Sequence, residues 1–173
     1  MDFKKAAFLG IAAAATAFPV LGYTLSLPFR IRYERVYFSN LPGHLSGLKI
    51  LHISDFHARY PHKMHMDIWP SLMALNFDMA VITGDIILND IRQLRPHLSG
   101  LRQLSEKAPV FYVDGNHESG MQDHIGKIFT DIGVIPLYNR RGSFMVGSND
   151  KAKSPIVSVA GFMDYNHLAD RNF

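Results

Sequence analysis

The sequence predicts an α/β fold with a largely parallel sheet and helices packed outside it. Three short apolar runs rich in β-forming residues alternate with segments in which apolar residues recur at helical spacing. Alternating buried strands and helices are typical of a parallel sheet, because parallel strands need a crossover connection between them. Each apolar run also ends directly in a polar cluster, and functional groups collect at the carboxyl ends of parallel strands.

The predicted elements follow one another along the chain. Buried strands are expected at Leu48–Ser54, Phe77–Thr83 and Pro109–Val113, after a first strand at Tyr33–Phe38. Helices are expected at Ile68–Leu75, Asp90–Leu104 and His124–Ile132. Shorter strands are expected near the end, at Val134–Leu137, Ser143–Val146 and Ile156–Ala160.

The amino-acid composition argues against several classes of protein. The 173 residues are 47% hydrophobic and 19% charged, which indicates a folded chain of about one domain. A net charge of +3 is too small to make nucleic acid the expected partner, so the sequence carries no nucleic-acid-binding signal. Cysteine is absent, which excludes disulfides, thiolate metal sites and thiol nucleophiles.

The first 30 residues are predicted to lie outside the folded domain, which then covers residues 31–173. Lys4 and Lys5 precede Ala6–Leu27, a stretch without any charged residue. About 20 apolar residues can cross a bilayer as one helix. A retained membrane anchor is therefore expected, with membrane lipid as the partner of this segment and the protein associated with the membrane.

Two alternatives to an anchor stay open for the apolar segment. Ala15-Thr16-Ala17 resembles the cleavage site of a secretory signal, which would leave a secreted product, and a buried core helix is the other alternative. The orientation in the membrane is also open, because basic residues flank the segment on both sides. The basic residues after it, which could contact anionic lipid head groups, are Arg30, Arg32 and Arg35.

Polar clusters follow the three buried strands. They are Asp55-Phe56-His57, Gly84-Asp85 and Gly115-Asn116-His117-Glu118. The spacing is about one strand–helix–strand unit of ~30 residues, so parallel strands bring all three to one rim. Two carboxylates packed there without a cation would repel each other, whereas a divalent ion removes the repulsion. Oxygen and imidazole ligands without thiolate suit Mn, Fe or Zn, so the pattern predicts a metal site.

The three clusters resemble the first three motifs of the calcineurin-like metallophosphoesterases, D-x-H, G-D and G-N-H-[DE]. The phrase LKILHISDFHAR and the apolar amino terminus resemble the bacterial membrane-associated phosphodiesterase branch, which includes enzymes acting on UDP-2,3-diacylglucosamine. The resemblance covers roughly Leu48–Asp164. It implies a four-layer αββα metallophosphoesterase sandwich around two divalent metal ions, of which this chain would hold the amino-terminal part.

The resemblance also implies roles for individual residues. Asp55 and His57 would bind one ion, Asp85 would bridge both, and Asn116 would bind the second, while His117 would be a catalytic acid that contacts the phosphate. A hydroxide bridging the two ions would hydrolyse the phosphoester. The substrate would carry a phosphodiester or pyrophosphate bond, and a lipid-linked or nucleotide-sugar substrate is the expected class.

Two later motifs of the family, a histidine after a further strand and Gly-His-x-His, are not found. Ser158–Asp164 resembles the strand before the first of them, and His167 is not expected to be the missing ligand. The sequence is therefore expected to represent an incomplete enzyme that is inactive alone. The alternative is a non-catalytic, membrane-tethered module that binds phosphate or a single metal. A P-loop or dinucleotide protein is disfavoured, because neither glycine-rich motif is present.

The sequence also predicts the surroundings of four further residues near the clusters. Asp114 and Glu118 are expected either to orient the histidine of the third cluster or to be solvated turn carboxylates. His52 is expected in the core or behind the ligands. Trp69 is expected to pack in the core.

Overall fold

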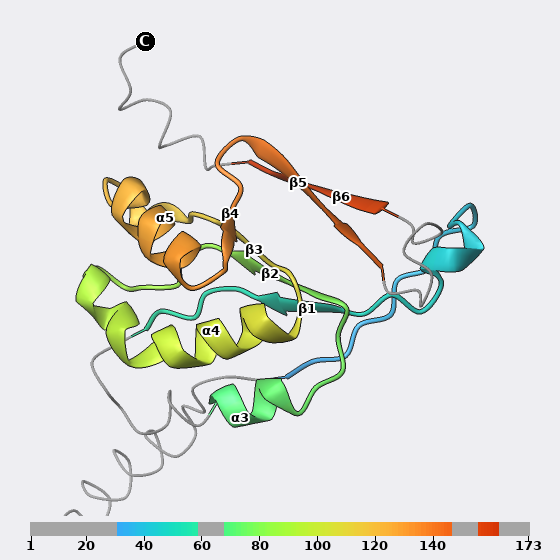
Figure 1. The fold of residues 1–173 in the computed structure, drawn as a ribbon, viewed down its shortest axis with the longest axis horizontal. Helices are drawn as coiled ribbons and strands as arrows, with labels where there is room; N and C mark the ends of the chain where they lie inside the picture. Colours follow the sequence, from blue (N-terminus) through green and yellow to red (C-terminus); the bar gives the residue numbers. More distant parts are fainter. Residues whose placement is uncertain (1–30, 59–67, 147–155, 163–173) are drawn as a thin grey trace, which may run out of the picture. The chain divides into compact units, whose positions relative to one another are not determined.

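The computed structural model describes residues 31–58, 68–146 and 156–162 (Figure 1). Contacts divide the chain into Met1–Arg35 and Val36–Phe173, and every helix and strand named below belongs to the second unit. Within the described ranges, no helix combines the length and apolar character that a bilayer span needs. The predicted anchor or signal segment lies outside the described residues.

The main sheet has four parallel strands in the order β1-β2-β3-β4. The strands are β1 (Ile50–Ile53), β2 (Met79–Thr83), β3 (Val110–Val113) and β4 (Ile135–Pro136). The register aligns the strand ends, with Ile53 opposite Ile82 and Ile82 opposite Tyr112. This confirms the predicted parallel sheet and brings the segments after β1, β2 and β3 to one edge.

Helices cover one face of this sheet (Figure 1). They are α3 (Ile68–Met73), α4 (Leu98–Lys107) and α5 (Gln122–Asp131), with short 3₁₀ segments η1 (Gly43–Leu45), η2 (Ile91–His97) and η3 (Asn116–Glu118). Alternate strand residues face this layer. Tyr112 of β3, for example, packs edge to face on Phe129 of α5 with ring centroids 4.5 Å apart.

The predicted helix Asp90–Leu104 is two elements, η2 followed by α4. Pro96 lies near the junction, where its missing N–H and its ring oppose a continuous α-helix. Asp90 caps η2 by accepting a hydrogen bond from the Arg92 amide at 2.9 Å. Hydrogen bonds from Arg92 also hold the pKa of the Asp90 carboxyl below its usual value.

A second, antiparallel sheet packs on the other face of the main sheet and consists of β5 (Arg140–Met145) and β6 (Ile156–Gly161). Between the sheets lies a buried cluster of Met79, Phe111, Leu137 and Phe144. The described residues thus form three layers, one of helices and two of strands, and agree with that much of the predicted αββα sandwich.

The strand predicted at Tyr33–Phe38 is wrong. Residues 31–38 have no regular secondary structure and form no ladder with any described strand. Tyr33 is 83% exposed and Tyr37 is 78% exposed, so neither ring packs on a sheet. The alternating pattern is compatible with a strand, but a strand forms only where a partner backbone supplies hydrogen bonds.

Two glycines allow the loops after β2 and β3 to approach each other closely. Gly84 has φ +89°, and a Cβ there would lie 2.4 Å from the Gly115 amide nitrogen. A Cβ on Gly115 would lie 2.2 Å from Asp85 Oδ1. Both contacts are too short for any side chain, so the G-D and G-N-H clusters need these glycines for space.

Glu118 ties the same two loops together. Its side chain is 0% exposed. Oε2 accepts hydrogen bonds from the amides of Asp85 and Gly115, both at 2.8 Å, and Oε1 accepts from the Ile87 amide at 3.1 Å. The expectation of a solvated turn carboxylate is therefore wrong for Glu118, and the carboxylate binds backbone amides. A buried carboxylate is tolerated because these three donors satisfy it.

Glu118→Gln is expected to lower the free energy of unfolding by about 1–3 kcal/mol. Glutamine keeps only one side-chain oxygen, so at least one of the three backbone amides faces an NH₂ group and loses its acceptor. Urea unfolding followed by circular dichroism measures the change.

Glu106→Gln is the matched control, because Glu106 is exposed on α4. Its free energy of unfolding should stay within about 0.5 kcal/mol of the unmodified chain. Equal stabilities for the two variants would contradict the role given to Glu118.

Candidate metal centre

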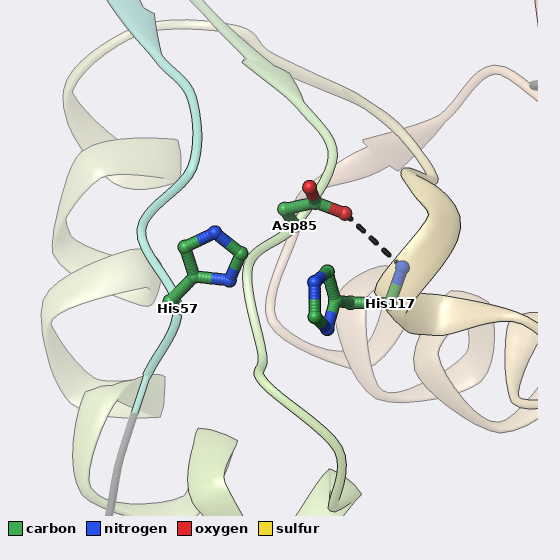
Figure 2. A group of neighbouring side chains, drawn as sticks. All are labelled: His57, Asp85 and His117. Carbon is green, nitrogen blue, oxygen red and sulfur yellow. Dashed lines mark hydrogen bonds between the residues drawn. The ribbon is translucent and has the colours of Figure 1, made fainter.

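Three side chains from three separate loops converge at the carboxyl edge of the main sheet (Figure 2). They are His57 after β1, Asp85 after β2 and His117 in η3. Each offers one nitrogen or oxygen ligand atom, and these atoms all lie within 4.8 Å of one another. Among the described histidine and acidic side chains, this is the group whose spacing suits a metal ion.

The backbone at this edge adopts unusual conformations. Positive φ angles occur at Asp55 (52°), His57 (44°) and Asp85 (51°). In the described part of the chain only one further non-glycine residue has a positive φ, Asn139. Each such residue costs about 1–3 kcal/mol, and residues of this kind gather at active sites and ligand clamps. Three of the four fall on predicted metal ligands.

Hydrogen bonds between the loops hold the strained segments in register. The His57 amide donates to the Asp85 carbonyl at 2.8 Å, and the Ala58 amide donates to the Ile86 carbonyl at 2.9 Å. The His117 amide donates to Asp85 Oδ1 at 3.1 Å, the bond drawn in Figure 2. Asp85 is therefore bonded to both neighbouring loops, through its carbonyl to the first and through its carboxylate to the third.

The two imidazoles have different environments. Their rings meet edge to face, with centroids 4.7 Å apart. His117 Nδ1 lies 2.5 Å from the Leu88 carbonyl oxygen, and because a carbonyl only accepts, this nitrogen carries the proton. His57 Nδ1 is buried and has no hydrogen-bond partner in the described structure. An unpartnered buried nitrogen beside a carboxylate fits a metal ligand, so the residues present suit a divalent ion.

Asp55 and Asn116, the other two predicted ligands, are exposed. Asp55 Oδ2 accepts a hydrogen bond from Ser54 Oγ at 2.5 Å, and Asp55 does not belong to the group. Asn116 precedes His117 in η3. The structure thus gathers His57, Asp85 and His117, and Asp55 is not part of this group.

Asp114 is also buried, and the solvated-turn expectation is wrong for it as well. Its carboxylate is 4% exposed. Burial, followed by the negative charge of Asp114, raises the pKa of the Tyr112 and Tyr138 hydroxyls well above the usual value. Both hydroxyls therefore stay protonated and neutral, which excludes them as bases near this edge.

The structure confirms the predicted core position of Trp69 but not that of His52. Trp69 is 5% exposed, which confirms its predicted place in the core. His52 is exposed on β1, with Nε2 2.7 Å from Thr83 Oγ1, so the prediction of a core histidine is wrong. It points to the face of the sheet away from the helices, because alternate residues of a strand face opposite sides.

Sequence reasoning missed the amide-binding role of Glu118. A signal was present, since Glu118 follows Gly115 by three residues at the start of η3. At this spacing a glutamate reaches back to the backbone amide before a helix. The bonds to Asp85 and Ile87 had no such signal, because they join loops more than 30 residues apart.

Comparison with known proteins gives two relatives, each described as a transmembrane protein with metallophosphoesterase domain. The one from Bos taurus is 27% identical over 128 residues, which is 72% of this chain and 29% of the relative. The one from Danio rerio is 27% identical over 103 residues, which is 57% of this chain and 24% of the relative. The chain therefore spans less than a third of the length of either protein.

A family model described as calcineurin-like phosphoesterase matches residues 48–171. The match covers more than half of the chain and contains His57, Asp85 and His117. The chain belongs to the calcineurin-like phosphoesterase family.

Proposed function

We propose that this chain carries the amino-terminal ligands of a metal-dependent phosphoester hydrolase. The observation that carries the proposal is the convergence of His57, Asp85 and His117, with ligand atoms within 4.8 Å on three loops of the sheet edge. Family membership supports a hydrolase acting on phosphoesters. A cluster whose backbone is strained at two of its three members further favours a functional site over a solvated surface.

The proposed ligands are those of the family motifs. His57 and Asp55 would hold one divalent ion, Asn116 would hold a second, and Asp85 would serve both. Mn, Fe and Zn all suit this set of carboxylate, imidazole and amide donors. Bound divalent ions activate water and stabilise charge on the phosphoryl oxygens.

The chain's own residues hold these groups in place. Asp85 is placed by its bonds to the His57 and His117 amides and by the Glu118 carboxylate on its own amide. His117 donates through Nδ1 to Leu88, which orients its ring and leaves Nε2 for the chemistry. As the proposed acid, His117 would act as the imidazolium, which carries a proton on each ring nitrogen. It would give the Nε2 proton to the leaving oxygen of the phosphoester and keep the Nδ1 proton on the Leu88 carbonyl.

The substrate and the membrane association are proposed from the relatives and the sequence. Two relatives are named as transmembrane proteins, and Ala6–Leu27 is uncharged and long enough to cross a bilayer. A site held near a bilayer favours a phosphodiester or pyrophosphate bond in a lipid-linked or nucleotide-sugar substrate. Membership of the bacterial phosphodiesterase branch belongs to the same proposal.

A second candidate function is a module that binds one ion or phosphate without turnover. The three-residue group favours it, because three ligands are fewer than two ions need. In a protein that contains the whole domain, metal binding without hydrolysis would support this module, and metal binding with hydrolysis would support the enzyme.

Asp85→Asn is expected to lower manganese-dependent hydrolysis of bis-p-nitrophenyl phosphate about a hundredfold or more. The change removes the bridging charge, whose interaction with a bound ion is worth several kcal/mol, but keeps an oxygen for the His117 amide. Initial rates with and without EDTA measure the effect in a protein that contains the whole domain.

Asp78→Asn is the control, because Asp78 precedes the other end of β2 and accepts from the Lys49 amide at 2.7 Å. Its hydrolysis rate should match that of the unmodified protein. An unchanged rate for Asp85→Asn, or activity that survives EDTA, would contradict metal-dependent hydrolysis.

His57→Ala is expected to weaken manganese binding by at least about tenfold, because its buried Nδ1 would otherwise face the ion. Isothermal titration calorimetry on the 173-residue chain measures the affinity. His52→Ala is the matched control, since His52 lies on β1, the strand before His57, and does not belong to the three-residue group. Equal affinities for the two variants would remove His57 from the ligand set.

His117→Ala distinguishes a proton donor from a metal ligand. As a donor, His117 matters most for alkyl leaving groups, for which a loss of about a hundredfold in kcat is expected, and less for p-nitrophenolate, which leaves without a proton. Manganese affinity should be retained. Equal losses for both leaving groups together with weaker manganese binding would make His117 a ligand.

A further inference from the structure

An aromatic cluster of Phe56, Trp69 and His97 lies next to the turn that carries the first predicted ligands. Phe56, between Asp55 and His57, contacts two rings from the helical layer. Its ring centroid lies 5.6 Å from that of Trp69 and 4.9 Å from that of His97, which it meets edge to face. Phe56, the middle residue of the D-x-H motif, thus points to the helices, whereas His57 points toward Asp85 and His117 (Figure 2).

The two partner rings are held rigidly. Trp69 of α3 is 5% exposed and His97 at the end of η2 is 1% exposed. Trp69 Nε1 donates a hydrogen bond to His97 Nδ1 at 3.2 Å. The indole also lies against Gly100 of α4, where a Cβ would come within 2.2 Å of it. The pair therefore forms a fixed wall that joins α3, η2 and α4.

A histidine at position 97 supplies something that an apolar residue cannot. A buried indole N–H needs an acceptor, and His97 Nδ1 is the one it has. This bond sets the rotation of the indole and the orientation of the imidazole edge toward Phe56. The acceptor role also requires that Nδ1 carry no proton.

The turn itself needs such a support. Asp55 and His57 both have positive φ angles, which side-chain-bearing residues adopt only when the surroundings impose them. The amides of His57 and Ala58 bond to the loop after β2, which holds the turn from one side. Phe56 is the contact that holds it from the side of the helices.

We propose that Trp69 and His97 are positioning residues, which set the Asp55–His57 turn through the ring of Phe56. Neither residue belongs to the group of candidate ligands, so both act through Phe56. The inference deepens the proposed function, because it adds to the metal site a support built from the helical layer. Its consequence is that metal affinity depends on a tryptophan–histidine bond in the core.

The first test needs no metal. In the metal-free, full 173-residue chain, amide hydrogen exchange at His57 and Ala58 is followed by NMR for His97→Ala and for Leu104→Ala. Leu104 is 0% exposed on α4 and lies outside the aromatic cluster, so its truncation controls for general loss of stability. His97→Ala should speed exchange at these two amides about tenfold beyond its effect on the slowest core amides. Leu104→Ala should change all of them together.

Trp69→Phe is the second variant, which keeps an aromatic ring and removes only the donor. It should speed exchange at the same two amides, and His97→Asn, which can still accept from the indole, should fall between His97→Ala and the unmodified chain. This series keeps the test decisive if His97→Ala does not fold. Exchange at His57 and Ala58 that follows global stability alone in every variant would overturn the proposal.

Cobalt binding is the third measurement, by titration and by the visible absorption of the bound ion. His97→Ala should weaken cobalt affinity about tenfold and change the absorption, whereas Leu104→Ala should do neither. Unaltered affinity and absorption in His97→Ala would overturn the positioning role. An unmodified chain that binds no cobalt would instead contradict the proposed function, and the exchange data would still decide the role of His97.

Discussion

The Glu118 carboxylate is the interaction on which the candidate site depends. It is fully buried and accepts hydrogen bonds from the amides of Asp85, Ile87 and Gly115, so it joins the loop after β2 to the loop after β3. Burying a carboxylate is costly without such donors, and their presence makes the contact specific in direction as well as in distance. Gly84 and Gly115 provide the space that lets the loops meet.

The parallel sheet and the residues with positive φ angles bring the candidate ligands together around this contact. Because β1, β2 and β3 run the same way, their following loops meet at one edge, and short-range bonds then place His57 and His117 on either side of Asp85. Positive φ angles at Asp55, His57 and Asp85 direct these side chains away from the course of their strands. These conformations cost free energy of folding, and the hydrogen bonds between the loops hold them in place. The protein thereby keeps the side chains in the geometry that ligands need.

Much of this arrangement could be predicted from the sequence, because it follows from local patterns. The apolar runs located β1, β2 and β3, and the polar clusters after them predicted that His57, Asp85 and His117 would meet. What could not be predicted depends on contacts between distant segments. The amide bonds of Glu118, the exposure of His52 and the Trp69–His97 pair each depend on which element packs opposite. The strand predicted at Tyr33–Phe38 failed for the same reason, since alternation cannot supply a pairing partner.

Anomalous diffraction from a crystal of this chain soaked in manganese tests the central claim most directly. A manganese peak is expected at the carboxyl edge of the main sheet, within about 2.0–2.3 Å of an Asp85 carboxylate oxygen and a His57 ring nitrogen. A peak at another surface, or none at this edge at a saturating manganese concentration, would contradict the claim that the three loops form a metal centre.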